Sequence, residues 1–206
     1  MELQDRILHK GDELFRRFGI RSITMDDIAK HLGVSKKTIY QHYPDKDELV
    51  SAVTKHNISR HCTVMEQCIG PASPDAIGEM YAVNQNMGEM IRSFNPIMFY
   101  DLQKYHPKAW MEFRIFRNEF IKTKIVENMK RGISEGIYRD NFNIDILAKM
   151  RLEQVDMTFN YDIFPPSDFQ FHEVMLELTL HFLHGLVNEK GLELINYYNK
   201  NTSIKK

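Results

Sequence analysis

The stretch ITMDDIAKHLGVSKKTIYQHYPDKDELV, residues Ile23–Val50, decides the fold of this chain. Its first part places apolar side chains one helical turn apart, at Met25, Ile28, Ala29 and Leu32. This spacing predicts a short helix with one buried face. Thr24 precedes that helix and can accept a hydrogen bond from the amides of its first turn. Gly33 follows it, and glycine readily takes the left-handed conformation that ends many helices.

A second, very short helix is expected directly after this turn, in KKTIYQH at residues 36–42. Ser35 can cap its first turn, and Pro44 cannot extend it because proline lacks a backbone N–H. The chain then restarts at Asp45, with Glu48 three residues later, which is the capping-box arrangement. We therefore expect a long helix from there to about Cys68.

A helix up to Phe18 precedes these elements, and its apolar face is expected to support them. Ile7, Leu14 and Phe18 lie at helical spacing, and Gly19 can take the left-handed conformation after the last turn. The arrangement matches a helix-turn-helix unit, in which the second short helix enters the major groove of DNA. Its expected inward residues are Ile28, Ala29, Leu32, Val34 and Ile39.

The outward side chains of the short helix have the chemistry that duplex DNA requires. Residues 30–46 hold four lysines and one acid, although the whole chain has a formal charge of −1. Lys36 and Lys37 can reach phosphates or guanine acceptors, and Gln41 can pair with adenine. Hydroxyl groups and Lys46 can bind backbone phosphates, which are the same in every DNA sequence. The predicted DNA-contacting residues are Thr24, Lys36, Lys37, Thr38, Tyr40, Gln41, His42, Tyr43 and Lys46.

This stretch resembles the N-terminal pattern of the TetR family of bacterial transcription regulators. The shared features are T-x-x-x-I-A from Thr24, GVS at 33–35, TIY at 38–40 and aromatic-Pro-x-K-x-x-L from Tyr43. Lys37 departs from the pattern, since many members have Gly or Ala there. The resemblance implies a homodimer, joined through the last two long helices of each subunit, and a pocket for a small-molecule inducer. It also implies a repressor that binds a palindromic double-stranded DNA operator and is released by its ligand.

The remainder of the chain is expected to be helical, which makes the whole chain all-α. The predicted helices cover about 75–94, 96–105, 107–135, 143–163, 168–188 and 192–199, and proline, glycine and asparagine separate them. We place a helix-turn-helix DNA-binding domain at 1–46, followed by a larger helical regulatory and dimerisation domain at 47–206. The segment Phe182–Tyr198 resembles the C-terminal end of family members.

Large, adaptable apolar side chains concentrate in the middle of the chain. Ordinary core packing accounts for such a concentration, and an apolar ligand pocket is the alternative, because methionine repacks easily around a ligand. The candidate pocket residues are Met87, Met90, Phe94, Met98, Tyr100, Trp110, Phe113 and Met150. The sequence does not select between these two interpretations.

Several other functions are disfavoured by the sequence. No apolar run approaches the roughly 18 residues that a membrane-spanning helix needs, and we expect a cytoplasmic protein. P-loop, zinc-protease and nucleophile-elbow motifs are missing, so neither an enzyme nor a cofactor is expected. His61 and Cys68 share a helix face but lie about 10 Å apart along it, too far to bind one ion. A helical protein that uses its N-terminal unit to bind another protein remains a rival interpretation.

Overall fold

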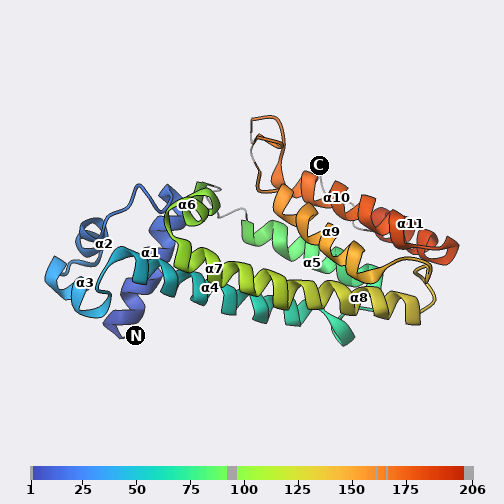
Figure 1. Cartoon of the computed structure of the whole chain (residues 1–206), viewed down its shortest axis with the longest axis horizontal. Coiled ribbons are helices and arrows are strands. Elements are labelled where there is room, and N and C mark those ends of the chain that lie inside the picture. The colour runs from blue at the N-terminus through green and yellow to red at the C-terminus, as the bar shows by residue number, and fades with distance from the viewer. Residues whose placement is uncertain (1, 92–96, 161, 166, 202–206) are drawn as a thin grey trace. The chain divides into compact units, whose positions relative to one another are not determined.

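The computed structural model describes residues 2–91, 97–160, 162–165 and 167–201, and most of them lie in helices (Figure 1). The helices are α1 (Leu3–Phe18), α2 (Met25–Leu32), α3 (Lys36–His42), α4 (Lys46–Cys68), α5 (Ala76–Ile91), α6 (Ile97–Tyr105), α7 (Pro107–Phe116), α8 (Lys122–Ser134), α9 (Ile144–Met157), α10 (Phe171–Leu186) and α11 (Glu189–Asn201). These residues form no strand beyond an isolated bridge between Tyr138 and Val187. The predicted all-α fold with an N-terminal helix-turn-helix is thereby confirmed.

Contacts within the chain divide it into two compact units. The first unit comprises Met1–Cys62 and Arg92–Phe116, and the second comprises Thr63–Ile91 and Arg117–Lys206. The predicted boundary after residue 46 divides the chain by function and remains a prediction. No helix in the described ranges is long and apolar enough to cross a membrane.

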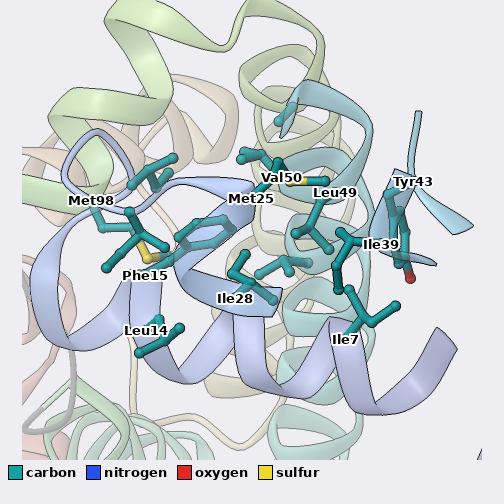
Figure 2. Close-up of a cluster of buried hydrophobic side chains, with 14 of the residues drawn as sticks. Ile7, Leu14, Phe15, Met25, Ile28, Ile39, Tyr43, Leu49, Val50 and Met98 are labelled. Atoms are coloured by element: carbon teal, nitrogen blue, oxygen red, sulfur yellow. The ribbon is translucent and has the colours of Figure 1, made fainter. Parts of the chain in front are cut away.

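The core of the first unit lies between α1, α2, α3, α4 and the α6–α7 pair (Figure 2). Its fully buried side chains include Ile7, Ile28 and Ile39, as their spacing predicts. Leu32 and Val34 are only partly buried and pack against the edge of this core. The short helices α2 and α3 gain most of their stability from this packing, because short isolated helices are marginal in water.

The predicted packing of α1 is wrong at Phe18, which was expected to face inward. Its side chain is 45% exposed instead of lying against the short helices, and the Arg17 guanidinium sits 4.9 Å from its ring centre. Phe15, three residues earlier, fills the inward position instead and is 1% exposed. Phe18 is the last residue of α1 and precedes Gly19, whose φ of 81° turns the chain away.

The second unit has its own core, formed by α5, α8, α9, α10 and α11. Ile77, Met129 and Leu183 are fully buried within it. Beside this apolar core lies a buried carboxylate, Glu79, which is 4% exposed. It accepts hydrogen bonds from Asn128 at 2.9 Å and from Arg131 at 3.0 Å, so its charge is compensated by a cation from α8.

Several predicted helix limits differ from the observed ones. The single helix predicted at 107–135 contains a π-helical turn at Arg117–Ile121, which separates α7 from α8. The helix predicted at 143–163 ends at Met157, where the Thr158 hydroxyl donates to the carbonyl of Val155 at 2.6 Å. The last helix begins at Glu189 instead of 192, because the Asn188 side chain accepts from the amide of Gly191 at 3.1 Å. Residues 92–96, where two helices were expected to meet, lie outside the described residues.

Candidate nucleic-acid interface

The turn between α2 and α3 is built by local hydrogen bonds that the sequence predicts. The Thr24 hydroxyl accepts from the amide of Asp27 at 3.1 Å, and the Asp27 carboxylate accepts from the amide of Thr24 at 2.9 Å. The Thr24 hydroxyl also donates to the Asp27 carboxylate at 2.6 Å, and this bond, together with the one from the Thr24 amide, lowers the pKa of Asp27. Gly33 has φ of 67°, in the left-handed region, and its N–H closes the end of α2. Thr24 thus serves as a helix cap and remains exposed at the surface.

Helix α3 is held by its buried face and by its own cap. Its Ile39 is fully buried, and the Ser35 hydroxyl accepts from the amide of Thr38 at 3.1 Å. The opposite face is open, since Lys36, Lys37, Tyr40 and Gln41 are exposed. This geometry lets a seven-residue helix present its side chains to a groove without depending on its intrinsic helix propensity.

Lys36 and Lys37 differ in what holds them. The Lys36 ammonium lies 3.0 Å from the Asp26 carboxylate of α2, and this hydrogen bond raises the pKa of Lys36. It also lies 5.8 Å from the centre of the Tyr40 ring. Within the described part of the chain, Lys37 makes neither a hydrogen bond nor an ion pair. Lys37 is therefore the cation on α3 that is free to meet an anion.

The other predicted contact residues are less accessible. Thr38 and His42 are partly buried, and the Thr38 hydroxyl lies 2.7 Å from that of Ser35. Tyr43 is 6% exposed, and burial raises the pKa of its hydroxyl. Burial also lowers the pKa of Lys46, while the nearby carboxylates of Asp101, Asp47 and Asp27 oppose this shift.

Polar contacts between α4 and the α6–α7 pair were not predicted from the sequence. Asp47 lies 2.6 Å from the His106 ring nitrogen, and the Lys108 ammonium donates to Glu48 at 2.5 Å. One turn further along α4, the Ser51 hydroxyl donates to Glu112 at 3.0 Å. The partners are about 60 residues apart in sequence, so no local pattern indicates them. Glu48 was expected to form a capping box with Asp45. Its backbone amide does donate to the Asp45 carboxylate at 2.8 Å, but its own carboxylate accepts from Lys108.

A similar contact fixes the loop that leads into α2. The backbone amide of Arg21 donates to the Asp101 carboxylate of α6 at 2.9 Å, and Asp101 is 3% exposed. The start of α4 and the entry to the helix-turn-helix are thus both attached to α6–α7.

The candidate pocket residues lie in different surroundings. Met98 is buried in the first unit, where Trp110 and Phe113 pack against the same core. Met87 is partly buried in the second unit, while Tyr100 and Met150 are 54% and 42% exposed. The Met90 side chain and Phe94 lie outside the described residues. A pocket lined by these residues remains a prediction.

The histidines and cysteines do not assemble into a cluster in the described ranges. No group of three or more metal-ligating side chains occurs among those residues. His61 is partly buried, and loss of contact with water lowers its pKa; its ring lies 5.8 Å from that of Phe116. Neither Cys62 nor Cys68 forms a disulfide within the described part of the chain.

A buried three-helix support, a glycine turn and an exposed cationic helix define a helix-turn-helix DNA-binding protein. Residues 7–53 match the family model described as "Bacterial regulatory proteins, tetR family". Residues 7–53 therefore form the DNA-binding domain of a TetR-family transcriptional regulator. The resemblance noted in the sequence is thereby confirmed.

Matches to individual proteins extend over most of the chain. An uncharacterized HTH-type transcriptional regulator of Bacillus subtilis, YvaF, is 23% identical over 188 residues, covering 91% of this chain and 97% of its own. A TetR-family regulator from Agrobacterium tumefaciens superposes with a TM-score of 0.73 at 16% identity, covering 90% and 97%. A regulator from Saccharomonospora viridis, solved in complex with choline, gives a TM-score of 0.68 at 18% identity, covering 90% and 98%. The structural likenesses support the fold.

Proposed function

We propose that this chain is a ligand-released repressor that binds a palindromic operator as a homodimer. The observation that carries the proposal is the open face of α3, where Lys37, Tyr40 and Gln41 stand exposed above a buried underside. Two copies would place their α3 helices in successive major grooves, with half-sites about one helical turn apart. Bound over a promoter, such a dimer would block polymerase.

Dimerisation through the C-terminal helices is supported by an exposed apolar pair on α9. Ile146 and Met150 are 63% and 42% exposed, and residues four apart lie on one face of a helix. Water-exposed side chains of this size are favourably covered by another apolar surface. We therefore assign Met150 to the dimer face in preference to the ligand pocket. Sedimentation equilibrium tests this assignment, since Met150→Lys with Ile146→Lys should yield monomers.

Ligand release is proposed to act through α4. Its first turns are bonded to α6 and α7 at Asp47, Glu48 and Ser51, so a ligand that moves α7 would also move α4 and α3. The effect on DNA affinity is limited to the difference in ligand affinity between the two arrangements. The choline complex of the regulator from Saccharomonospora viridis supports the idea that this fold accommodates small molecules.

The DNA face is tested by comparing two lysines with different proposed roles. Selection from a random duplex pool should first recover a palindromic site. Lys37→Ala should then change which bases are preferred, because its free ammonium reaches base edges. Lys46→Ala should weaken all duplexes about equally and flatten the slope of log affinity against log salt by about one unit. Gel shifts at four salt concentrations measure both. Identical behaviour of the two variants contradicts this division of roles.

A second prediction concerns the ion pair on Lys36. Asp26→Asn should raise affinity for duplex DNA by about two- to fivefold, because it frees Lys36 and removes a negative charge beside α3. Fluorescence anisotropy at low salt measures the change. Glu13→Gln is the matched control, since it breaks an exposed ion pair with Lys10 on α1. An equal gain in both variants would mean that overall charge, and not the release of Lys36, sets the affinity.

A further inference from the structure

Arg151 on α9 is a buried cation that forms no ion pair with any described residue. The residue is 5% exposed, and its Nη2 donates to the Thr179 hydroxyl of α10 at 2.6 Å. That hydroxyl in turn donates to the carbonyl of Met175 at 2.7 Å, so it is fixed as an acceptor for the arginine. The Phe182 ring centre lies 5.3 Å from the guanidinium carbon. The guanidinium is thus held in one orientation by α10.

This cation lacks the counter-charge that a buried arginine ordinarily has. Its Nη1 is fully enclosed and has no hydrogen-bond partner among the described residues. Burial lowers the pKa of Arg151 to about 10, and no neighbouring charge contributes to that shift. Arg117 and Arg131 in the same unit each bond two carboxylates. A buried unpaired charge is unfavourable, which indicates that Arg151 is kept for a partner that is not part of the unit.

A second unpaired polar group lies one turn further along α9. The Oε1 position of Gln154 is enclosed and has no hydrogen-bond partner in the described part of the chain. Residues three apart lie on the same side of a helix, so the Gln154 and Arg151 side chains leave α9 on the same side. The oxygen and nitrogen of a glutamine amide can be assigned either way round, so the enclosed position can equally hold the NH₂ group, which is a hydrogen-bond donor.

We propose that Arg151 binds the carboxylate of a small organic acid inside the second unit, with Gln154 as an additional donor. A guanidinium offers a carboxylate two parallel N–H donors, and one positive charge matches one negative charge. A phosphate dianion would lack a second cation here. The buried Phe182 ring beside the guanidinium suits an acid with an apolar body. This inference rests on the proposed ligand-responsive function and specifies the class of ligand.

A carboxylate from a second copy of the chain is the competing partner. Arg151 is buried within a single chain, whereas the exposed residues of α9 are Asp145, Ile146, Lys149, Met150 and Glu153. An anion must therefore enter the unit to meet Arg151. The observations favour a small molecule over a partner subunit.

The test uses the full chain without DNA and titrates it with sodium propionate, hexanoate, decanoate and benzoate, each against its neutral amide. Isothermal titration calorimetry should show at least one acid binding tenfold or more tightly than its amide. Arg151→Met should lower that affinity at least tenfold, whereas Lys149→Met, which removes an exposed cation from the same helix, should change it less than twofold. If no acid binds better than its amide at 10 mM, or if Arg151→Met binds it equally well, the proposal is overturned.

Stability separates this role from a structural one. Without ligand, Arg151→Met should unfold at the same temperature as the wild type or higher, because an apolar side chain of similar length replaces an unpaired charge. A lower unfolding temperature would mean that Arg151 has a charged partner within the fold and would overturn the proposal. So would dissociation of a dimer in Arg151→Met, which would assign the arginine to a partner subunit.

Operator release is then measured separately with the tightest acid. If the acid binds through Arg151 but leaves operator affinity unchanged, the site stands and the proposed ligand-released repression fails. If operator release occurs with the amides as well as with the acids and survives Arg151→Met, the regulator is ligand-responsive and the anion site is wrong.

Discussion

Arg131→Met is expected to lower the free energy of unfolding of the second unit by about 3–5 kcal/mol. Arg131 donates to Glu79, to Glu135 and to the carbonyls of Gly70 and Ser73, at distances of 2.6–3.0 Å. Because Glu79 is 4% exposed, removing the arginine leaves a carboxylate charge enclosed without its cation. Its two remaining hydrogen bonds, from Asn128 and from the amide of Gly70, compensate only part of that loss. Urea denaturation followed by circular dichroism measures the change.

Arg117→Met is the matched control for this prediction. Arg117 also pairs with two carboxylates, but the Glu153 and Asp156 side chains are 74% and 41% exposed and return to water when the arginine is lost. Its effect should therefore stay within about 1 kcal/mol, the range of surface ion pairs. If the two variants are equally destabilised, burial of the acidic partner is not what makes Arg131 important.

The sequence predicted those parts of the fold that local chemistry determines. Thr24, Ser35 and Gly33 cap or end their helices as expected, since each acts on atoms only a few residues away. The apolar spacing of α2 and α3 likewise predicted which side chains face inward. These local elements are enough to define the helix-turn-helix and the family.

The remaining features depend on contacts that no local pattern encodes. Asp47 and His106 are 59 residues apart, and Arg151 and Thr179 are 28 apart. Composition alone groups Met150 with the candidate pocket residues, and only the structure shows that it is exposed on α9 together with Ile146. The sequence gives no sign that Arg151 is buried, because an arginine in an amphipathic helix is ordinarily at the surface. Only its burial makes it a candidate site.

Ile39→Ala is expected to lower the stability of the first unit by about 2–5 kcal/mol and to reduce operator affinity at least tenfold. Ile39 is fully buried on α3 and lies in the core that α1, α2 and α4 share. A seven-residue helix has little stability of its own, so its position depends mainly on packing, and Ile39 is its buried side chain. Loss of that anchor should allow α3 to leave its place even while the rest of the unit stays folded.

The chain offers a specific probe for this prediction. Trp110 is the only tryptophan, and it packs against the core of the first unit, so its fluorescence during denaturation reports on that unit. Ile39→Val serves as the graded control, because it keeps most of the buried volume and should cost only about 0.5–1.5 kcal/mol. Operator affinity, measured at 25 °C where both variants are folded, should fall in the order wild type, Val, Ala. Unchanged operator affinity in the alanine variant would show that α3 is held by other contacts, or that DNA is bound elsewhere.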